Sequence, residues 1–96
     1  MPFFSTNITP TTAPQPLMAN KPLIQRVKQI SISVRSMGTA SYIAVGGQDS
    51  QDKRFTSTGS GMSISPIGEE KSVDITTIRI VSDTADAVVD IFGEST

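Results

Sequence analysis

The chain has 96 residues, with eight basic and nine acidic side chains, a formal net charge of −1, and neither cysteine nor histidine. This length fits one domain, and the near-zero charge gives no general attraction to nucleic acid. Without cysteine no disulfide can form, and without cysteine and histidine the usual zinc and haem ligands are missing. No stretch approaches the length of a membrane span. We therefore predict one small domain with no cofactor, no metal, no nucleic-acid partner and no membrane partner.

Residues 1–22 are predicted to form an extended N-terminal arm, separate from a body made of residues 23–96. Residues 1–20 carry no charged side chain, and five of the six prolines fall within the first 22 residues. Proline lacks the backbone N–H and fixes φ, which disfavours helices and central strands. A small body has little surface to spare for such a long arm, so we expect another chain to anchor it.

The body is predicted to begin with two strands. In residues 28–35 apolar and polar side chains alternate strictly, which is typical of a half-buried strand. Arg26 and Lys28 share the face of Ile30, so we expect the burial of that face to begin near Ile30. Residues 41–45 are apolar on both faces, which indicates a central strand.

The second half of the body continues with short segments rich in β-branched residues. Turn-forming residues separate these segments, and none has the 3.6-residue period of a helix. The predicted fold class is all-β, a small antiparallel β-sandwich or barrel of six to seven strands with an extended N-terminal arm. The further strand-like segments are 53–56, 62–65, 73–75, 78–81 and 87–92.

Charge is distributed unevenly along the chain. Residues 1–48 carry four basic side chains and no acid, whereas residues 49–96 carry nine acids and four basic side chains. Two interpretations stay open: charged strand faces that keep the protein soluble, or complementarity between subunits or with a scaffold. The small core and this charge split favour a homo-oligomer, a dimer or a trimer.

The sequence offers no catalytic constellation. Serine and threonine are abundant, but no histidine is present as a base for them. Three acidic pairs lie in predicted turns of a body too small for a deep cleft, namely Asp49/Asp52, Glu69/Glu70 and Asp83/Asp86. Calcium binding by the first or the last pair stays open, because hard cations favour clustered oxygen ligands, although neither has the spacing of an EF-hand. We predict that the protein is not an enzyme.

From Tyr42 onward the chain combines a strand ending in Val-Gly-Gly, a hydroxyl-rich loop, an acidic Gly/Pro turn, two β-branched segments and a Val-Ser-Asp-Thr-Ala turn. The segments are Val45–Gly47, Pro66–Glu70, Val73–Ile78, Val81–Ala85 and Val88–Ile91. This pattern resembles small β-sandwich proteins encoded in the head modules of tailed bacteriophages. The resemblance covers about 55 of the 96 residues.

The resemblance implies a capsid decoration (cement) protein. Such proteins bind the outer surface of the assembled virion shell as dimers or trimers and staple neighbouring subunits of the major capsid protein with extended arms. The expected location is the outer capsid surface, after synthesis in the host cytoplasm. Deleting residues 2–20 is expected to leave a folded body that no longer binds the shell. The residues expected to contact the partner are Phe3, Phe4, Ile8, Leu17, Met18, Arg26, Lys28 and Arg35.

Two other roles stay open at this point. One is a carbohydrate- or receptor-binding module of a phage fibre, since small β-sandwiches often serve that use. The chain has no tryptophan, and its single tyrosine, Tyr42, is the one residue of these two types available for stacking on a sugar. The other role is a component of the head–tail connector, which would be present in few copies per particle.

Overall fold

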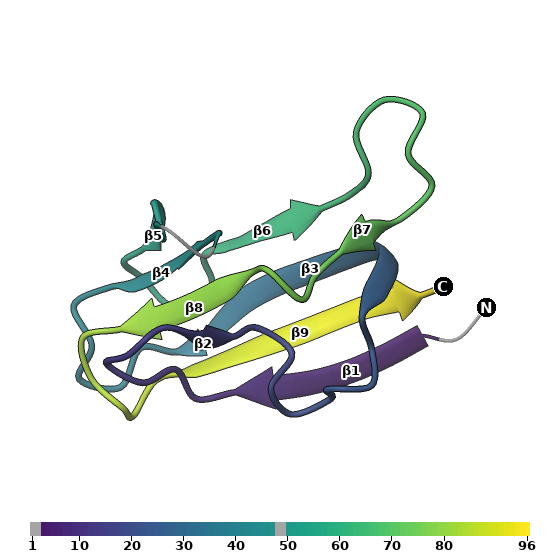
Figure 1. Cartoon of the computed structure of the whole chain (residues 1–96). Helices are drawn as coiled ribbons and strands as arrows, with labels where there is room; N and C mark the ends of the chain where they lie inside the picture. The colour runs from purple at the N-terminus through teal and green to yellow at the C-terminus, as the bar shows by residue number, and fades with distance from the viewer. Residues whose placement is uncertain (1–2, 48–49) are drawn as a thin grey trace.

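The computed structural model describes residues 3–47 and 50–96 and consists of two antiparallel sheets that pack face to face (Figure 1). The larger sheet has the strand order β1-β9-β3-β6, with β7 also paired to β3, and the smaller sheet has the order β2-β8-β4-β5. The predicted all-β class is confirmed. The strands in these residues are β1 (Phe3–Ile8), β2 (Gln15–Pro16), β3 (Arg26–Ser36), β4 (Ile43–Gly46), β5 (Lys53–Phe55), β6 (Gly61–Ile64), β7 (Val73–Asp74), β8 (Arg79–Ser82) and β9 (Val88–Ser95).

Strand β3 follows the predicted alternation, with one difference at its start. Ile30, Ile32 and Val34 are buried, while the residues between them face solvent. Val27 is also completely buried, so burial begins earlier than expected. The register of β3 against β9 shifts between Val27 and Gln29, which is a β-bulge that adds one residue to the strand. Because of this bulge, Val27 and Ile30 both face the core although they are three residues apart.

The hydrophobic core lies between the two sheets. Ser82 is the buried polar residue of the described chain, and its Oγ donates to the carbonyl of Tyr42 and accepts the N–H of Thr84, both at 3.3 Å. Because this hydroxyl both donates and accepts a hydrogen bond, its burial leaves no unpaired polar group that would destabilise the fold. The apolar core residues are Ile8, Leu17, Met18, Val27, Ile30, Ile32, Val34, Ile43, Val45, Phe55, Ile75, Ile80, Ala87, Val89 and Ile91.

Residues 3–22 are part of both sheets and do not form a separate arm. Strand β1 pairs with β9 along all of its six residues, and β2 pairs with β8 at the edge of the smaller sheet. The predicted division between an arm of residues 1–22 and a body of residues 23–96 therefore does not describe the fold. These two added strands explain why the sheets contain more strands than the six or seven predicted. Three residues of the segment belong to the core: Ile8, Leu17 and Met18.

The prolines of this segment lie where a sheet tolerates them. Pro16 is in β2, a two-residue strand at the edge of its sheet, and an edge strand has one side on which no ladder hydrogen bond is lost. Within the described residues, β1 contains no proline. Proline therefore disfavoured central-strand positions for these residues, but it did not exclude strands between them or at an edge.

Candidate functional site

The candidate site is the outer face of the larger sheet. Alternate residues of β1, β9 and β3 point to this face, and the strand registers align them in rows across the sheet. The first row consists of Phe3, Glu94 and Gln29; the second of Ser5, Phe92 and Ser31; the third of Asn7, Asp90 and Ser33. The face is therefore mostly small and polar, with two phenylalanine side chains set diagonally on neighbouring strands.

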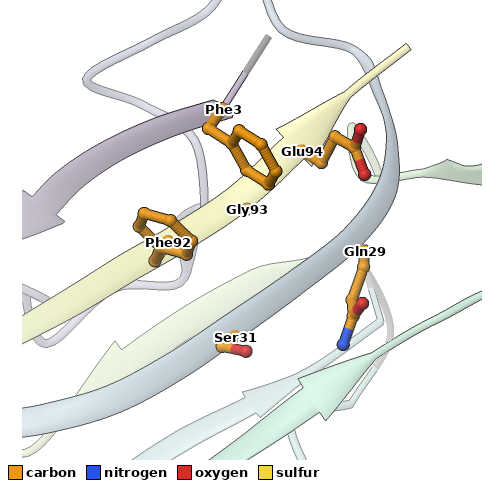
Figure 2. A pocket seen from close by; sticks show the side chains of 6 residues that line it. All are labelled: Phe3, Gln29, Ser31, Phe92, Gly93 and Glu94. Carbon is orange, nitrogen blue, oxygen red and sulfur yellow. The ribbon is translucent and has the colours of Figure 1, made fainter. Parts of the chain in front are cut away.

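The two phenylalanine rings form the apolar part of this face. The ring centroids of Phe3 and Phe92 are 6.0 Å apart and the ring planes differ by 18°. Phe3 is 67% exposed and Phe92 is 56% exposed, because their neighbours in the rows are short or polar side chains. The rings border a shallow hollow of about 150 Å³, whose other lining residues are Gln29, Ser31, Gly93 and Glu94 (Figure 2).

Gly93 supports the site from the inner side of the sheet. It is buried in β9, opposite Phe4 of β1 and Ile30 of β3. A Cβ atom on this residue would lie 2.6 Å from the carbonyl oxygen of Gln29 and 2.9 Å from the Cζ atom of Phe4. The missing side chain leaves room for the ring of Phe4, which packs against the core and holds β1 against β9.

An ion pair lies at the third row of the face. The Nη2 of Arg35 is 2.9 Å from Oδ1 of Asp90, and its Nε donates to Oδ2 at 2.9 Å. The two side chains are 62% and 35% exposed, so water screens the pair and its contribution to stability is small. Its effect is geometric, because the two-point contact orients both side chains relative to each other on this face.

The structure divides the residues predicted to bind a partner. Phe3 is exposed on the candidate face, and Phe4 is half-buried beneath it. The other three apolar residues, Ile8, Leu17 and Met18, are 3%, 1% and 5% exposed. These three belong to the core of their own chain and have no surface to offer to a partner, which corrects the prediction for them.

The predicted basic contacts all lie on β3. Arg26 is held at the start of the strand, where its Nε donates to Oγ of Ser72 at 2.8 Å and its Nη2 to the carbonyl of Ser72 at 3.2 Å. Lys28 is half-buried in the same strand. Arg35 reaches the candidate face through its ion pair with Asp90.

Sequence reasoning missed Phe92, although a signal for it was present. Asp90 and Phe92 have the same parity in the predicted last strand, while Val89 and Ile91 have the other. Since side chains alternate in a strand, a solvent-facing Asp90 implies a solvent-facing Phe92.

A larger hollow of about 490 Å³ lies beside β2 and the following turn. Its apolar lining includes Met18, Ile24 and Ile75. These side chains belong to the core or pack directly against it. The hollow is therefore the rim of the core, at the side of the sandwich.

Two of the acidic residues considered as calcium ligands, Asp83 and Asp86, fasten a loop through hydrogen bonds. The carboxylate of Asp83 accepts the N–H of Ser41 at 2.9 Å, and that of Asp86 accepts the N–H and the hydroxyl of Thr39 at 3.0 and 2.9 Å. The hydroxyl of Thr84 also donates to Asp86, at 2.6 Å. Of the other pair, Asp49 lies outside the described residues and Asp52 accepts a hydrogen bond from a neighbouring serine. The described residues contain no group of three or more His, Cys, Asp or Glu side chains placed to hold a metal ion.

These hydrogen bonds shift the pKa values of the carboxyls. The hydroxyl of Thr84 and then the N–H of Thr39 lower the pKa of Asp86 from 3.8. At Asp83 desolvation raises the pKa, but the hydrogen bonds from the N–H groups of Ser41 and Tyr42 outweigh it, so the net pKa is lowered. Both carboxylates are charged in the folded protein at neutral pH.

Stability is expected to fall in acid because of these loops. A carboxyl whose folded pKa is lowered binds a proton more readily in the unfolded chain, so it stabilises the fold above its unfolded pKa and stops doing so as the pH falls through the folded pKa. The melting temperature is expected to change little on this account from about pH 7 to about pH 5. It should decrease once the pH drops below 3.8, the ordinary pKa of an aspartate carboxyl. Thermal unfolding followed across this range checks it, with Asp86→Asn as the control. That variant should show a smaller drop in acid, and an equal drop would contradict this role for Asp86.

Within residues 3–47 and 50–96 there is no helix long and apolar enough to cross a membrane. No protein-family model fits the chain, and neither a curated protein nor a solved structure is significantly similar to it.

Proposed function

We propose that this protein is a structural component of a tailed-phage virion, which binds the outside of the capsid and staples neighbouring major capsid subunits. The supporting observation is the exposed Phe3–Phe92 pair on an open sheet face. Exposed aromatic side chains in a polar surround are typical of docking surfaces rather than of a free protein surface. The pattern from Tyr42 onward supports the phage role. Because residues 3–22 are folded into the sheets, docking is assigned to this face and not to a free arm.

The energy available from this face is sufficient for binding at many equivalent positions. Full burial of a phenylalanine side chain is worth about 1.5–3 kcal/mol, and more than half of each ring is still exposed in the free protein. A gain of this size at each site is modest by itself. Repetition over a shell with many identical positions, each bridging two capsid subunits, would make the total resistance to separation large.

The substitution Phe92→Ser is expected to weaken binding to the shell by about tenfold, since it removes roughly 1.4 kcal/mol of apolar burial at the interface. Phe3→Ser should act similarly. Co-sedimentation of the purified protein with capsids that were assembled without it measures this, together with the number of copies bound per shell. We expect a copy number close to that of the major capsid protein.

The matched control for these variants is Ile67→Ser. Ile67 is 87% exposed on the loop between β6 and β7, away from the candidate face. Its replacement should leave shell binding unchanged. If all three variants bind as well as the wild type, the face is not the docking surface. A dozen copies or fewer per particle would instead support the connector role.

A second candidate function is carbohydrate binding by the same face. The specific observation is that Gln29 and Glu94 line the same hollow as the two rings. Sugars are bound by this combination of an aromatic surface and planar hydrogen-bonding groups. A glycan-array screen with the whole protein distinguishes the two functions. Binding to one glycan class that is lost in Phe92→Ser, without binding to the shell, would favour this candidate.

A further inference from the structure

Strand β1 is an edge strand without the protection found at the other edges of the two sheets. Edge strands present unpaired backbone groups, and monomeric proteins usually blunt them with charge, proline, bulges or shortness. Strand β2 has two residues including a proline, β5 has three residues including Lys53 and Arg54, and β6 has four residues. Strand β1 has six uncharged residues, without proline, in an unbroken register with β9.

The hydrogen-bonding pattern of the larger sheet shows which backbone N–H and C=O groups of β1 point away from β9. The N–H of Val34 donates to the carbonyl of Ser60, and the N–H of Gly59 donates to the carbonyl of Val34, so the backbone of Val34 points away from β9. Along an antiparallel strand, successive residues direct their N–H and C=O groups alternately to one neighbouring strand and to the other. Two residues in register therefore either bond to each other or both direct these groups away from each other. Val89, the partner of Val34, therefore directs its groups to Ile8 of β1.

The same alternation continues along β1. Phe4 and Thr6 bond to β9 as Ile8 does, whereas Phe3, Ser5 and Asn7 direct their N–H and C=O groups outward. An independent contact agrees with this assignment, because the carbonyl of Asn7 accepts a hydrogen bond from the side chain of Asn20 in the following loop. The outward-facing part of β1 is therefore three residues wide, with Ser5 at its centre, and within it the carbonyl of Asn7 is already bonded to Asn20.

We propose that this edge pairs with the same edge of a second copy of the chain, in an antiparallel register centred on Ser5. This two-fold register places Ser5 opposite the Ser5 of the other copy and Phe3 opposite its Asn7. All three outward-facing residues then find a partner, and the two larger sheets become one continuous sheet.

The charge pattern favours a second copy over a different protein. A two-fold axis brings identical side chains close together, and like charges directly opposite each other in a sheet are destabilising. Residues 3–20 carry no charge at all, so this edge can face itself without repulsion. A strand that recognises a different protein has no such requirement and usually carries charges complementary to it.

The contact between Asn20 and Asn7 is compatible with this pairing. The carbonyl of Asn7 accepts from Asn20 and, at 3.5 Å, from the hydroxyl of Thr6. A carbonyl oxygen has two lone pairs, and a hydroxyl can rotate toward solvent, so the lone pair that Thr6 releases can accept the Phe3 N–H of the other copy. The outer faces of the two copies would be joined side by side, with both phenylalanine pairs on the same surface. The proposal concerns the isolated protein and does not depend on shell binding.

Sedimentation equilibrium of the full chain tests the proposal. The wild type is expected to have twice the chain mass of 10.2 kDa. Ser5→Lys should dissociate it, because it places two ammonium groups beside the axis while its side chain points to solvent. The matched control is Ser31→Lys, which changes a serine of the same row on β3, in the interior of the sheet. This variant should keep the dimer mass.

A charge-swap experiment separates repulsion at the axis from misfolding. Ser5→Glu alone should also be monomeric, and an equimolar mixture of Ser5→Glu and Ser5→Lys should recover the dimer mass. The proposal is overturned if the wild type has the mass of one chain at every concentration. This result would overturn it even if β1 pairs with a different protein. A dimer that survives Ser5→Lys overturns it too, because the interface must then lie elsewhere. Loss of shell binding in the phenylalanine variants leaves these masses unchanged, so the two proposals fail separately.

Discussion

Removal of residues 3–20 is expected to abolish cooperative folding of this protein, not to leave a folded body as the sequence suggests. The truncation deletes β1 and β2 and takes three residues from the core, Ile8, Leu17 and Met18. Losing one large core side chain typically costs about 2–5 kcal/mol, while the whole stability of a small domain is about 5–15 kcal/mol. Far-UV circular dichroism during heating should show no sharp transition. A truncated chain that melts cooperatively would contradict the structural role of this segment.

A point substitution tests the same feature with the chain intact. Leu17→Ala is expected to lower the free energy of unfolding by about 2–5 kcal/mol, since Leu17 is 1% exposed. Leu23→Ala is the matched control, because Leu23 lies in the turn that follows and is 95% exposed. Its effect should stay within about 0.5 kcal/mol. Urea denaturation measures both, and equal effects would mean that Leu17 is not in the core.

Gly93→Ala is expected to destabilise the protein by about 1–3 kcal/mol, although replacing a glycine within a strand by alanine would ordinarily stabilise it. The new Cβ would lie 2.6 Å from the carbonyl oxygen of Gln29, which is backbone and cannot rotate away, and 2.9 Å from the ring of Phe4. The central strand β9 would have to shift, and the pairing with β1 would shift with it.

The control for this prediction is Gly47→Ala. A Cβ at Gly47 meets nothing within 4 Å, and its φ is not in the left-handed region. The variant should be neutral or slightly more stable. Thermal unfolding of the two variants compares them directly. A more stable Gly93→Ala protein would show that the sheet adapts at this position.

The strands of the body could be predicted because their burial alternates with a simple period. Residues 28–35 alternate between apolar and polar side chains, and residues 88–91 are rich in β-branched side chains; both segments lie in strands of the fold. The early burial of Val27 could not be predicted, because a β-bulge changes the phase of the alternation and has no mark of its own in this sequence.

The N-terminal strands were missed for a different physical reason. Proline and the absence of charge describe how a segment behaves alone, but β1 and β2 owe their order to partners distant in sequence, β9 and β8. Leu17 and Met18 were interpreted as contacts for another chain, whereas they are buried in the hydrophobic core of this chain. For the same reason the candidate face was visible only in part, since Phe3 and Phe92 meet through a pairing of the first strand with the last.

The pairing of β1 with β9 also affects the order of events during folding. Ile8 and its partner Val89 are about 80 residues apart in the chain. At a synthesis rate of about 5–20 residues per second, β1 is synthesised roughly 4–16 s before β9. For that time the apolar groups of Phe3, Phe4 and Ile8 have no native partner. Such distant contacts make folding slow, and β1 can enter its sheet only after the last strand of the chain has been synthesised.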